Sequence, residues 1–138
     1  MKFNKFFIGT MLAVACTMAF TACEKGGDDP FGPNTLTVAQ AIAKQDGKEA
    51  LVKGYVVGYY NVKPNPGECV FSADAPADTT VNKANVLIAD NASETNPANV
   101  VCVQLPAGQV RNLVNLGENP GNLGKVVVLK GVLTAYNT

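Results

Sequence analysis

The stretch LVKGYVVGYY, residues 51–60, decides the fold of this chain. Its residues are mainly β-branched or aromatic, and its length suits a strand better than a helix. Alternation along a strand places both glycines, Gly54 and Gly58, on the same face. A strand with glycines on its inner face can bend sharply, so one long strand can take part in both halves of a small barrel.

Further extended segments follow this strand along the chain. The pattern predicts strands at 86–90 and 100–105 and a long final strand at 125–136, which bends at Gly131. Both faces of the final strand are apolar, so both are expected to be covered. Residues 61–85 are rich in proline and glycine and are predicted to form a long excursion with one short strand at 68–71.

Two short helices complete the pattern. Thr37 and Gln40 form a capping box that opens the first helix, and Asp46 with Gly47 ends it. The second helix is predicted at 109–116, where apolar residues recur at helical spacing. The chain is therefore expected to be mostly β with two short helices, in the order strand, strand, strand, helix, strand.

This order resembles the OB-fold, a small β-barrel, and is distantly similar to OB domains attached to nucleases. More closely, residues 35–138 resemble an uncharacterised OB-fold domain of Bacteroidota surface lipoproteins. The segments that carry the resemblance are TVAQAI at 37–42, IAD at 88–90, VQLP at 103–106 and the stretch 119–125. Such relatives continue into a fifth strand, which this chain is expected to lack. Either the sequence is truncated before that strand, or the barrel closes imperfectly and leaves a strand edge open to another chain. Residues 23–138 alone are then expected to be less stable and more self-associating than a chain extended by ~15 residues.

The first 22 residues look like a bacterial lipoprotein signal. Two lysines precede an uncharged run at 6–20 that is too short for a comfortable membrane span. The sequence FTAC at 20–23 resembles a lipobox, which makes Cys23 the lipidated residue after cleavage. Cys16 is a poorer acceptor because it lies inside the apolar run. The alternative is an ordinary secretory signal with an incidental cysteine.

Residues 23–34 are acidic and rich in glycine and proline, as in a flexible tether. Acidic residues just behind the lipidated cysteine resemble the export signal of surface lipoproteins. Acyl chains on Cys23 would hold the protein on a membrane without spanning it. The expected location is therefore the outer membrane, with residues 35–138 facing the cell surface.

The composition argues against an enzyme. The chain has no histidine and no tryptophan, and serine occurs only at positions 72 and 93. A Ser-His-Asp or Cys-His arrangement and a histidine-dependent metal site are therefore excluded. Asp90 and Glu94 could form a carboxylate pair, but the favoured interpretation is that Asp90 ends a strand and caps a turn while Glu94 is a solvated loop charge. We expect no catalytic residues, no metal and no cofactor.

Two cysteines remain after lipidation, Cys69 and Cys102. Both lie in or beside extended segments, and an exported protein meets an oxidising compartment. They are therefore candidates for a disulfide between the excursion and the strand at 100–105. The alternative is two partly buried thiols.

The resemblance to OB domains implies a binding surface on the outer face of the barrel. Lys53, Tyr55 and Tyr59 would share one face of the first strand, with Gln104 on the third, and such groups can stack against sugar rings or bases. The alternative is that both tyrosines pack under the excursion. Nucleic acid is disfavoured because the chain after cleavage has nine basic and eleven acidic residues, a net charge of −2.

These features predict a lipid-anchored, non-catalytic OB-fold binding module of the cell envelope. Its ligand would be a glycan, a peptide or a neighbouring envelope protein. One alternative is the accessory nucleic-acid-binding domain of a secreted nuclease. Another is a structural envelope subunit that self-associates through its open strand edge.

Overall fold

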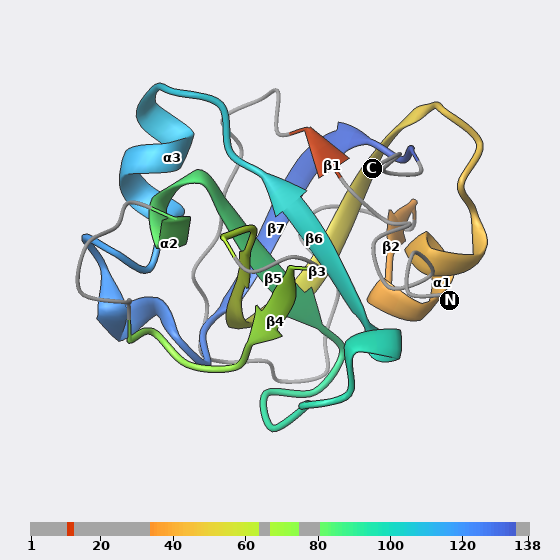
Figure 1. The fold of residues 1–138 in the computed structure, drawn as a ribbon. Coiled ribbons are helices and arrows are strands. Elements are labelled where there is room, and N and C mark those ends of the chain that lie inside the picture. The colour runs from red at the N-terminus through yellow and green to blue at the C-terminus, as the bar shows by residue number, and fades with distance from the viewer. Residues whose placement is uncertain (1–10, 13–33, 64–66, 75–80, 135–138) are drawn as a thin grey trace.

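The computed structural model describes residues 11–12, 34–63, 67–74 and 81–134 (Figure 1). Strands dominate this part of the chain, so the prediction of a mostly β domain with short helices is confirmed. This part of the chain has three α-helices instead of the two predicted. The additional one is the short helix α2 at Val81–Ala84, directly before the strand at Asn85–Ala89. The predicted lipidation site Cys23, most of the predicted signal and nearly all of the tether lie outside the described residues.

The central strand is β3, Glu49–Asn61, which extends the predicted strand by a few residues at its ends. Its first half pairs with β7, Val126–Val132, and its second half pairs with β5, Asn85–Ala89. Leu51 pairs with both β2, Thr35–Leu36, and β7, so these two strands lie on opposite edges of β3. The far end of β3 pairs with β4, Glu68–Val70.

The sheet continues from β5 to β6, Val100–Gln104, which is antiparallel to β5. A two-residue strand β1, Met11–Leu12, runs parallel to β6 on its other side. The sheet order is therefore β1-β6-β5-β3-β2, with β4 and β7 attached to β3. The remaining elements are short helices: α1 at Val38–Ala43, η2 at Pro97–Asn99, α3 at Gln109–Val114 and η3 at Pro120–Asn122.

A β-bulge interrupts the alternation of β3. The register with β5 shifts between Val56 and Gly58. Before the shift, Val52 and Val56 face the main core, and after it Tyr59 faces the same core. Val57 faces the opposite side. An extra residue in one strand exchanges the faces of all later side chains, so the face of Tyr59 differs from that given by simple alternation.

The two glycines of β3 allow close approach of other elements. A Cβ on Gly54 would lie 2.8 Å from Cγ2 of Val38, so α1 packs directly onto the strand there. A Cβ on Gly58 would collide with the carbonyl of Val70 and with the backbone of Phe71. The end of β4 therefore packs against β3 at Gly58, where no side chain intervenes.

Two apolar clusters lie on the two faces of the β5–β6 pair. The main core contains Val86, Ile88, Val101 and Val103 together with residues of β3, α1, α3 and β7. The second cluster contains Val57, Leu87, Ala89, Val100 and Cys102, and four partly buried residues pack against it: Tyr55, Tyr60, Cys69 and Phe71. The segment that includes β4 thus helps to cover the face that the OB resemblance implied as a binding surface.

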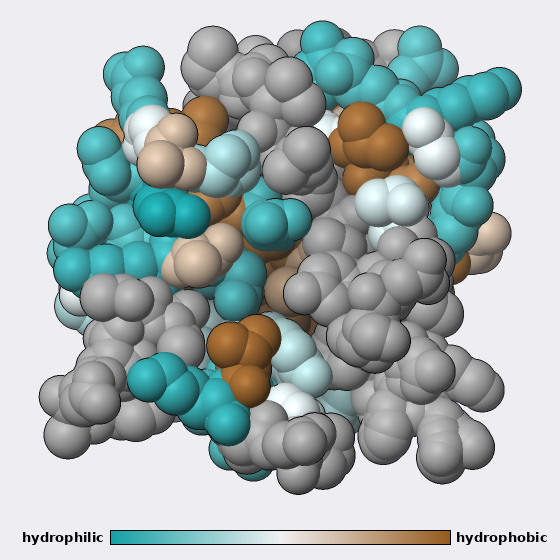
Figure 2. All heavy atoms as spheres, turned by 45° about the horizontal axis from the view of Figure 1, so that its top comes forward, coloured by the Kyte–Doolittle hydropathy of each residue, from teal (hydrophilic) through white to brown (hydrophobic). Residues whose placement is uncertain are grey.

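Both faces of β7 are buried, as the apolar pattern predicted. Val127 and Leu129 belong to the main core, and Val128 on the opposite face is 1% exposed. The coloured surface in Figure 2 is mainly hydrophilic, with apolar residues in separate small patches. Among the described residues, the large apolar side chains classed as exposed are Val62, Leu113 and Leu123. No helix in the described part of the chain is long and apolar enough to cross a membrane.

Candidate functional site

A pocket of about 310 Å³ opens where the start of α1 meets three strands of the sheet. It includes two of the predicted ligand-binding residues, Lys53 and Tyr55. The pocket is lined by Thr35, Leu36, Thr37, Lys53, Gly54, Tyr55, Asp90 and Val126. Groups from distant parts of the chain, the starts of α1 and β7 and the end of β5, therefore meet around the middle of β3.

The wall formed by α1 has its backbone donors satisfied. The Thr37 hydroxyl accepts from the backbone N–H of Gln40 at 3.1 Å, and the Gln40 side chain accepts from the N–H of Thr37 at 2.9 Å, which confirms the capping box. The Asp90 carboxylate accepts from the N–H groups of Val38 and Ala39 at 2.7 and 2.9 Å. These bonds satisfy N–H groups that a helix start otherwise leaves without partners, and they fix Asp90 beside the pocket.

Lys53 and Tyr55 lie two residues apart on β3 and so point to the same side of the sheet. Their partners across the strand pair are Val128 and Val126 of β7. Lys53 is exposed, whereas Tyr55 is half-buried and also packs against the second apolar cluster. The pocket thus offers a cation free to reach a ligand and an aromatic ring held in place.

Tyr59 and Gln104 do not join this site. Tyr59 is 1% exposed in the main core, and its hydroxyl donates to the carbonyl of Asp74 at 2.6 Å. Burial raises the pKa of Tyr59, and the negative charges of Asp74 and Glu68 raise it further. The prediction that Tyr59 shares a face with Tyr55 is wrong because the bulge turns it inward. The hydrogen bond to Asp74, a residue of the excursion, agrees instead with the alternative that Tyr59 packs under the excursion.

Gln104 is exposed at the end of β6, where it pairs with Asn85 and Leu12. The pocket instead includes the other end of β5, where Asp90 follows Ala89. Because β5 and β6 are antiparallel, Gln104 lies at the opposite end of that pair from Asp90. The structure therefore brings Lys53 and Tyr55 together and leaves Gln104 apart.

Asp90 and Glu94 do not act as a pair. Asp90 caps α1, not its own turn, while Glu94 accepts from the N–H of Asn96 at 3.0 Å and from Nδ2 of Asn99 at 3.2 Å. Within the described ranges, no three histidine, cysteine or acidic side chains are grouped so as to hold a metal ion. Asp90 serves in stabilising α1 and in shaping the pocket wall.

Cys69 and Cys102 are both free thiols in the structure. Cys102 is buried in the second cluster, and Cys69 packs against that cluster. Burial raises the pKa of each thiol to about 12, with a further contribution from Glu68 at Cys69 and from Cys69 at Cys102. Because the thiolate is the nucleophile, neither cysteine is activated for catalysis near neutral pH. Their pairing in an oxidising compartment stays a prediction.

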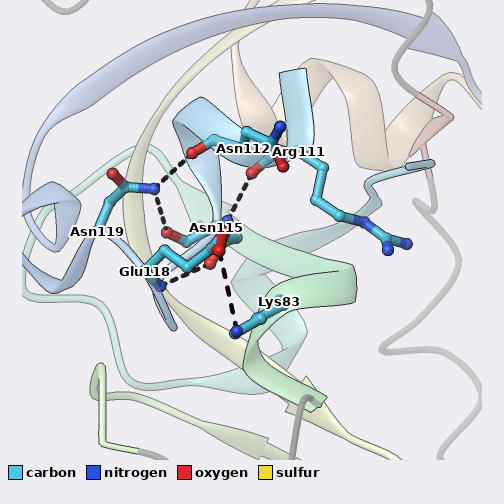
Figure 3. Close-up of polar contacts among 6 residues, drawn as sticks. All are labelled: Lys83, Arg111, Asn112, Asn115, Glu118 and Asn119. Carbon is cyan, nitrogen blue, oxygen red and sulfur yellow. Dashed lines mark hydrogen bonds and ion pairs between the residues drawn. The ribbon is translucent and has the colours of Figure 1, made fainter. Parts of the chain in front are cut away.

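A polar cluster around Asn115, which the sequence did not predict, lies outside the pocket, between α3 and η3 (Figure 3). Buried Asn115 donates through Nδ2 to the carbonyl of Arg111 at 2.7 Å and to the Glu118 carboxylate at 2.9 Å. Asn119 donates to the carbonyls of Asn112 and Asn115 at 2.8 and 3.0 Å. Lys83 of α2 lies 3.9 Å from Glu118.

This cluster fixes a connection and does not form a binding site. Most of its side-chain hydrogen bonds are made with backbone groups. They take the place of the backbone hydrogen bonds that a regular helix or strand would supply between α3 and β7. The Arg111 guanidinium points away from the asparagines in Figure 3, and its Nε donates to the carbonyl of Leu105 at 2.7 Å. The frequent asparagines at 112–122 were the available signal, since asparagine readily bonds nearby backbone.

The family model described as "Domain of unknown function (DUF6359)" matches residues 36–138. This range includes every residue of the pocket except Thr35, and the whole Asn115 cluster. No curated protein and no solved structure matches the chain. The chemistry of the site therefore has to be read from its own residues.

Proposed function

Because this chain belongs to the DUF6359 family, whose function is unknown, we propose its role from its own residues: a lipid-anchored, non-catalytic binding module of the cell envelope that takes a glycan unit in the Lys53–Tyr55 pocket. The observation that carries the proposal is the meeting of a cation, an aromatic ring and a carboxylate, those of Lys53, Tyr55 and Asp90, in one pocket of about 310 Å³. That volume lies at the small end of ligand sites, about 300–1,000 Å³.

The lining suits a sugar ring, which has an apolar face and a rim of hydroxyl groups. Tyr55 supplies an aromatic surface with a polar hydroxyl end. The Lys53 ammonium supplies three donors, and the carboxylate of Asp90 keeps acceptor capacity beyond its two bonds to α1. Leu36 and Val126 add apolar walls. The proposal of binding without catalysis rests on the sequence, which has no histidine for a Ser-His-Asp or Cys-His arrangement.

The strand arrangement supports an OB-type barrel as the scaffold. Strands β3, β5 and β6 are paired in sequence order, α3 follows β6, and β7 returns to pair with β3. The proposed ligand site differs from the one the resemblance implied, because residues of the β4 segment pack over the outer face of β5 and β6. The ligand would instead bind beside β3, at the start of α1.

The membrane anchor rests on the sequence, in particular on the lipobox-like residues 20–23 and the acidic tether behind them. Metabolic labelling with an alkynyl palmitate should tag the wild-type chain and not the Cys23→Ala variant. Protease treatment of intact cells should then remove the tagged domain if it faces outward. Equal labelling of wild type and variant would refute the anchor.

The pocket is tested by NMR titration of the ¹⁵N-labelled protein. The probes are glucose, N-acetylglucosamine and a β-1,4-linked disaccharide of each, with a short oligothymidylate and an unrelated tetrapeptide as comparison ligands. A bound sugar should shift the amide signals of Lys53, Tyr55 and Asp90 and leave that of Gln104 unchanged. Binding with a Kd on the order of 1 mM would correspond to about −4.1 kcal/mol.

Variants separate the pocket from the rest of the surface. Lys53→Met and Tyr55→Leu keep most of the volume of each side chain but remove the charge and the ring, and each should weaken sugar binding by about tenfold or more, roughly 1.4 kcal/mol. Gln104→Ala is the matched control, since Gln104 is exposed and lies outside the pocket. Binding of oligothymidylate alone would favour the nucleic-acid alternative, and equal sugar affinity in all variants would refute the pocket.

A further inference from the structure

The strongest unexplained feature is the short strand β1. Met11 and Leu12 pair in parallel with Val103 and Gln104 of β6, which come more than ninety residues later in the sequence. Strand β1 also lies close to β7, and Figure 1 shows it between the ends of β6 and β7. The other edge of β6 is taken by β5, and one edge of β7 is taken by β3. Residues 11–12 therefore occupy a position bounded by two strands that do not pair with each other in the described part of the chain.

We propose that the edge of β6 that faces β7 is a strand-acceptor site, which binds an extended apolar segment of a partner polypeptide parallel to β6. Residues 11–12 belong to the predicted signal, so signal removal, as in the proposed anchoring, would vacate the edge. The removal of residues 11–12 rests on the proposed function, whereas the acceptor site itself rests on the β1–β6 pairing.

The backbone of β6 offers hydrogen-bonding groups on this edge. The N–H of Leu105 donates to the carbonyl of Ala84 at 2.8 Å, on the side of β5. Successive residues of a strand direct their N–H groups to alternate edges, so the N–H groups of Gln104 and Cys102 point to the side of β1. An edge with free donors and acceptors is a template for an added strand.

The occupant should be a single extended segment and not a folded second copy. A second copy would have to pair edge to edge, but β7 lies on the far side of β1 and closes that approach. The flanking strands are valine-rich, and Val101, Val103, Val127 and Leu129 are buried in the main core. An added strand in this place is therefore expected to carry apolar residues, and the sequence of β1 is Met-Leu.

Amide hydrogen exchange on the full chain tests the proposal. The Met11→Pro variant removes the N–H group of β1 that the Met11–Val103 register directs at the Cys102 carbonyl of β6, and it disfavours the strand pairing. Exchange at Gln104 should therefore accelerate by about tenfold or more. Exchange at Leu105, whose N–H bonds on the β5 side, should stay as slow as in the wild type and reports that the variant is folded. Equal Gln104 exchange in both chains would overturn the proposal.

Rescue by a peptide then tests whether the β6 edge accepts an extended apolar segment from a separate chain. A synthetic GTMLAV peptide, residues 9–14, is added to the Met11→Pro chain, and it should slow Gln104 exchange again by about tenfold at saturation. The same peptide with proline in place of Met11 should have no effect. Protection by both peptides, or concentration-dependent protection without peptide and a dimer mass in light scattering, would overturn the proposal. Palmitate labelling of Cys23 has no part in this readout, so the anchor and the strand site can fail independently.

Discussion

The carboxylate of Asp90 accepts a hydrogen bond of 2.7 Å from the backbone N–H of Val38, 52 residues earlier in the chain. A second bond of 2.9 Å joins it to the N–H of Ala39. Together with Thr37, Asp90 therefore supplies the acceptors for the start of α1, and a carboxylate is favoured there by the helix dipole. The end of β5 and the start of α1 are thus joined at the mouth of the pocket.

Replacing Asp90 should loosen α1 and the pocket together. Asp90→Ala leaves two helix-start N–H groups without their side-chain acceptor and should lower the free energy of unfolding by about 1–2 kcal/mol. Urea denaturation measures this loss. Glu94→Ala is the control, because its carboxylate bonds only within its own loop. If the two variants unfold at the same urea concentration, the cap does not contribute to stability.

Gly58 should not accept a side chain. The added methyl of Gly58→Ala would meet the carbonyl of Val70, with the Cα of Phe71 2.9 Å away, so β4 would have to move from β3. Overpacking of this kind costs about 1–3 kcal/mol. Gly121→Ala is matched to it, because nothing lies within 4 Å of the new methyl and the backbone needs no positive φ. Thermal unfolding that ranks Gly121→Ala as the less stable variant would contradict this packing.

The sequence predicted those elements whose signals are local. The alternation at 51–60 predicts β3, and the Thr37–Gln40 capping box forms with both of its hydrogen bonds. The bulge could not be predicted, because Val56 and Val57 are both apolar and either can face a core. Because the bulge was not predicted, the face on which Tyr59 lies was predicted wrongly. The Asp90–Val38 bond was missed because sequence reasoning assigns a polar residue at a strand end to its own turn.

Asn115 should be the least replaceable residue of the α3–β7 connection. It is fully buried, and Asn115→Ala would remove its bonds to the Arg111 carbonyl, to the Glu118 carboxylate and to the Glu118 N–H. Unpaired buried groups cost about 1–3 kcal/mol each, so we expect a loss of roughly 2–3 kcal/mol in chemical denaturation. Asn112→Ala should be nearly neutral because its bond to Asn119 uses the backbone carbonyl. Similar losses in both variants would exclude this role.

Oxidation should join Cys69 to Cys102 in the exported protein. The two thiols belong to one apolar cluster, and the charge of one would affect the pKa of the other. A bridge closing a loop of about thirty-odd residues would contribute ~3 to 4 kcal/mol, less any strain. Mass spectrometry after alkylation without reduction measures it, with Cys69→Ala as the control that cannot pair. Two alkylated thiols at these positions would show that the bond is absent.

In the reduced protein, the same two thiols should make stability fall at high pH. Burial raises the pKa of Cys69 and Cys102 to about 12 from an ordinary value of 9.0, so the folded state favours the neutral thiol. Below pH 9.0 the thiols are neutral in both states and their stabilising effect is fully present. Between pH 9.0 and about 12 they ionise in the unfolded chain first, and the free energy of unfolding declines. Urea denaturation at pH 8 and 10.5 in reductant measures this. The free energy of unfolding should decline more steeply with pH for the wild type than for the double variant Cys69→Ala/Cys102→Ala. Parallel declines would mean that the thiols are not desolvated.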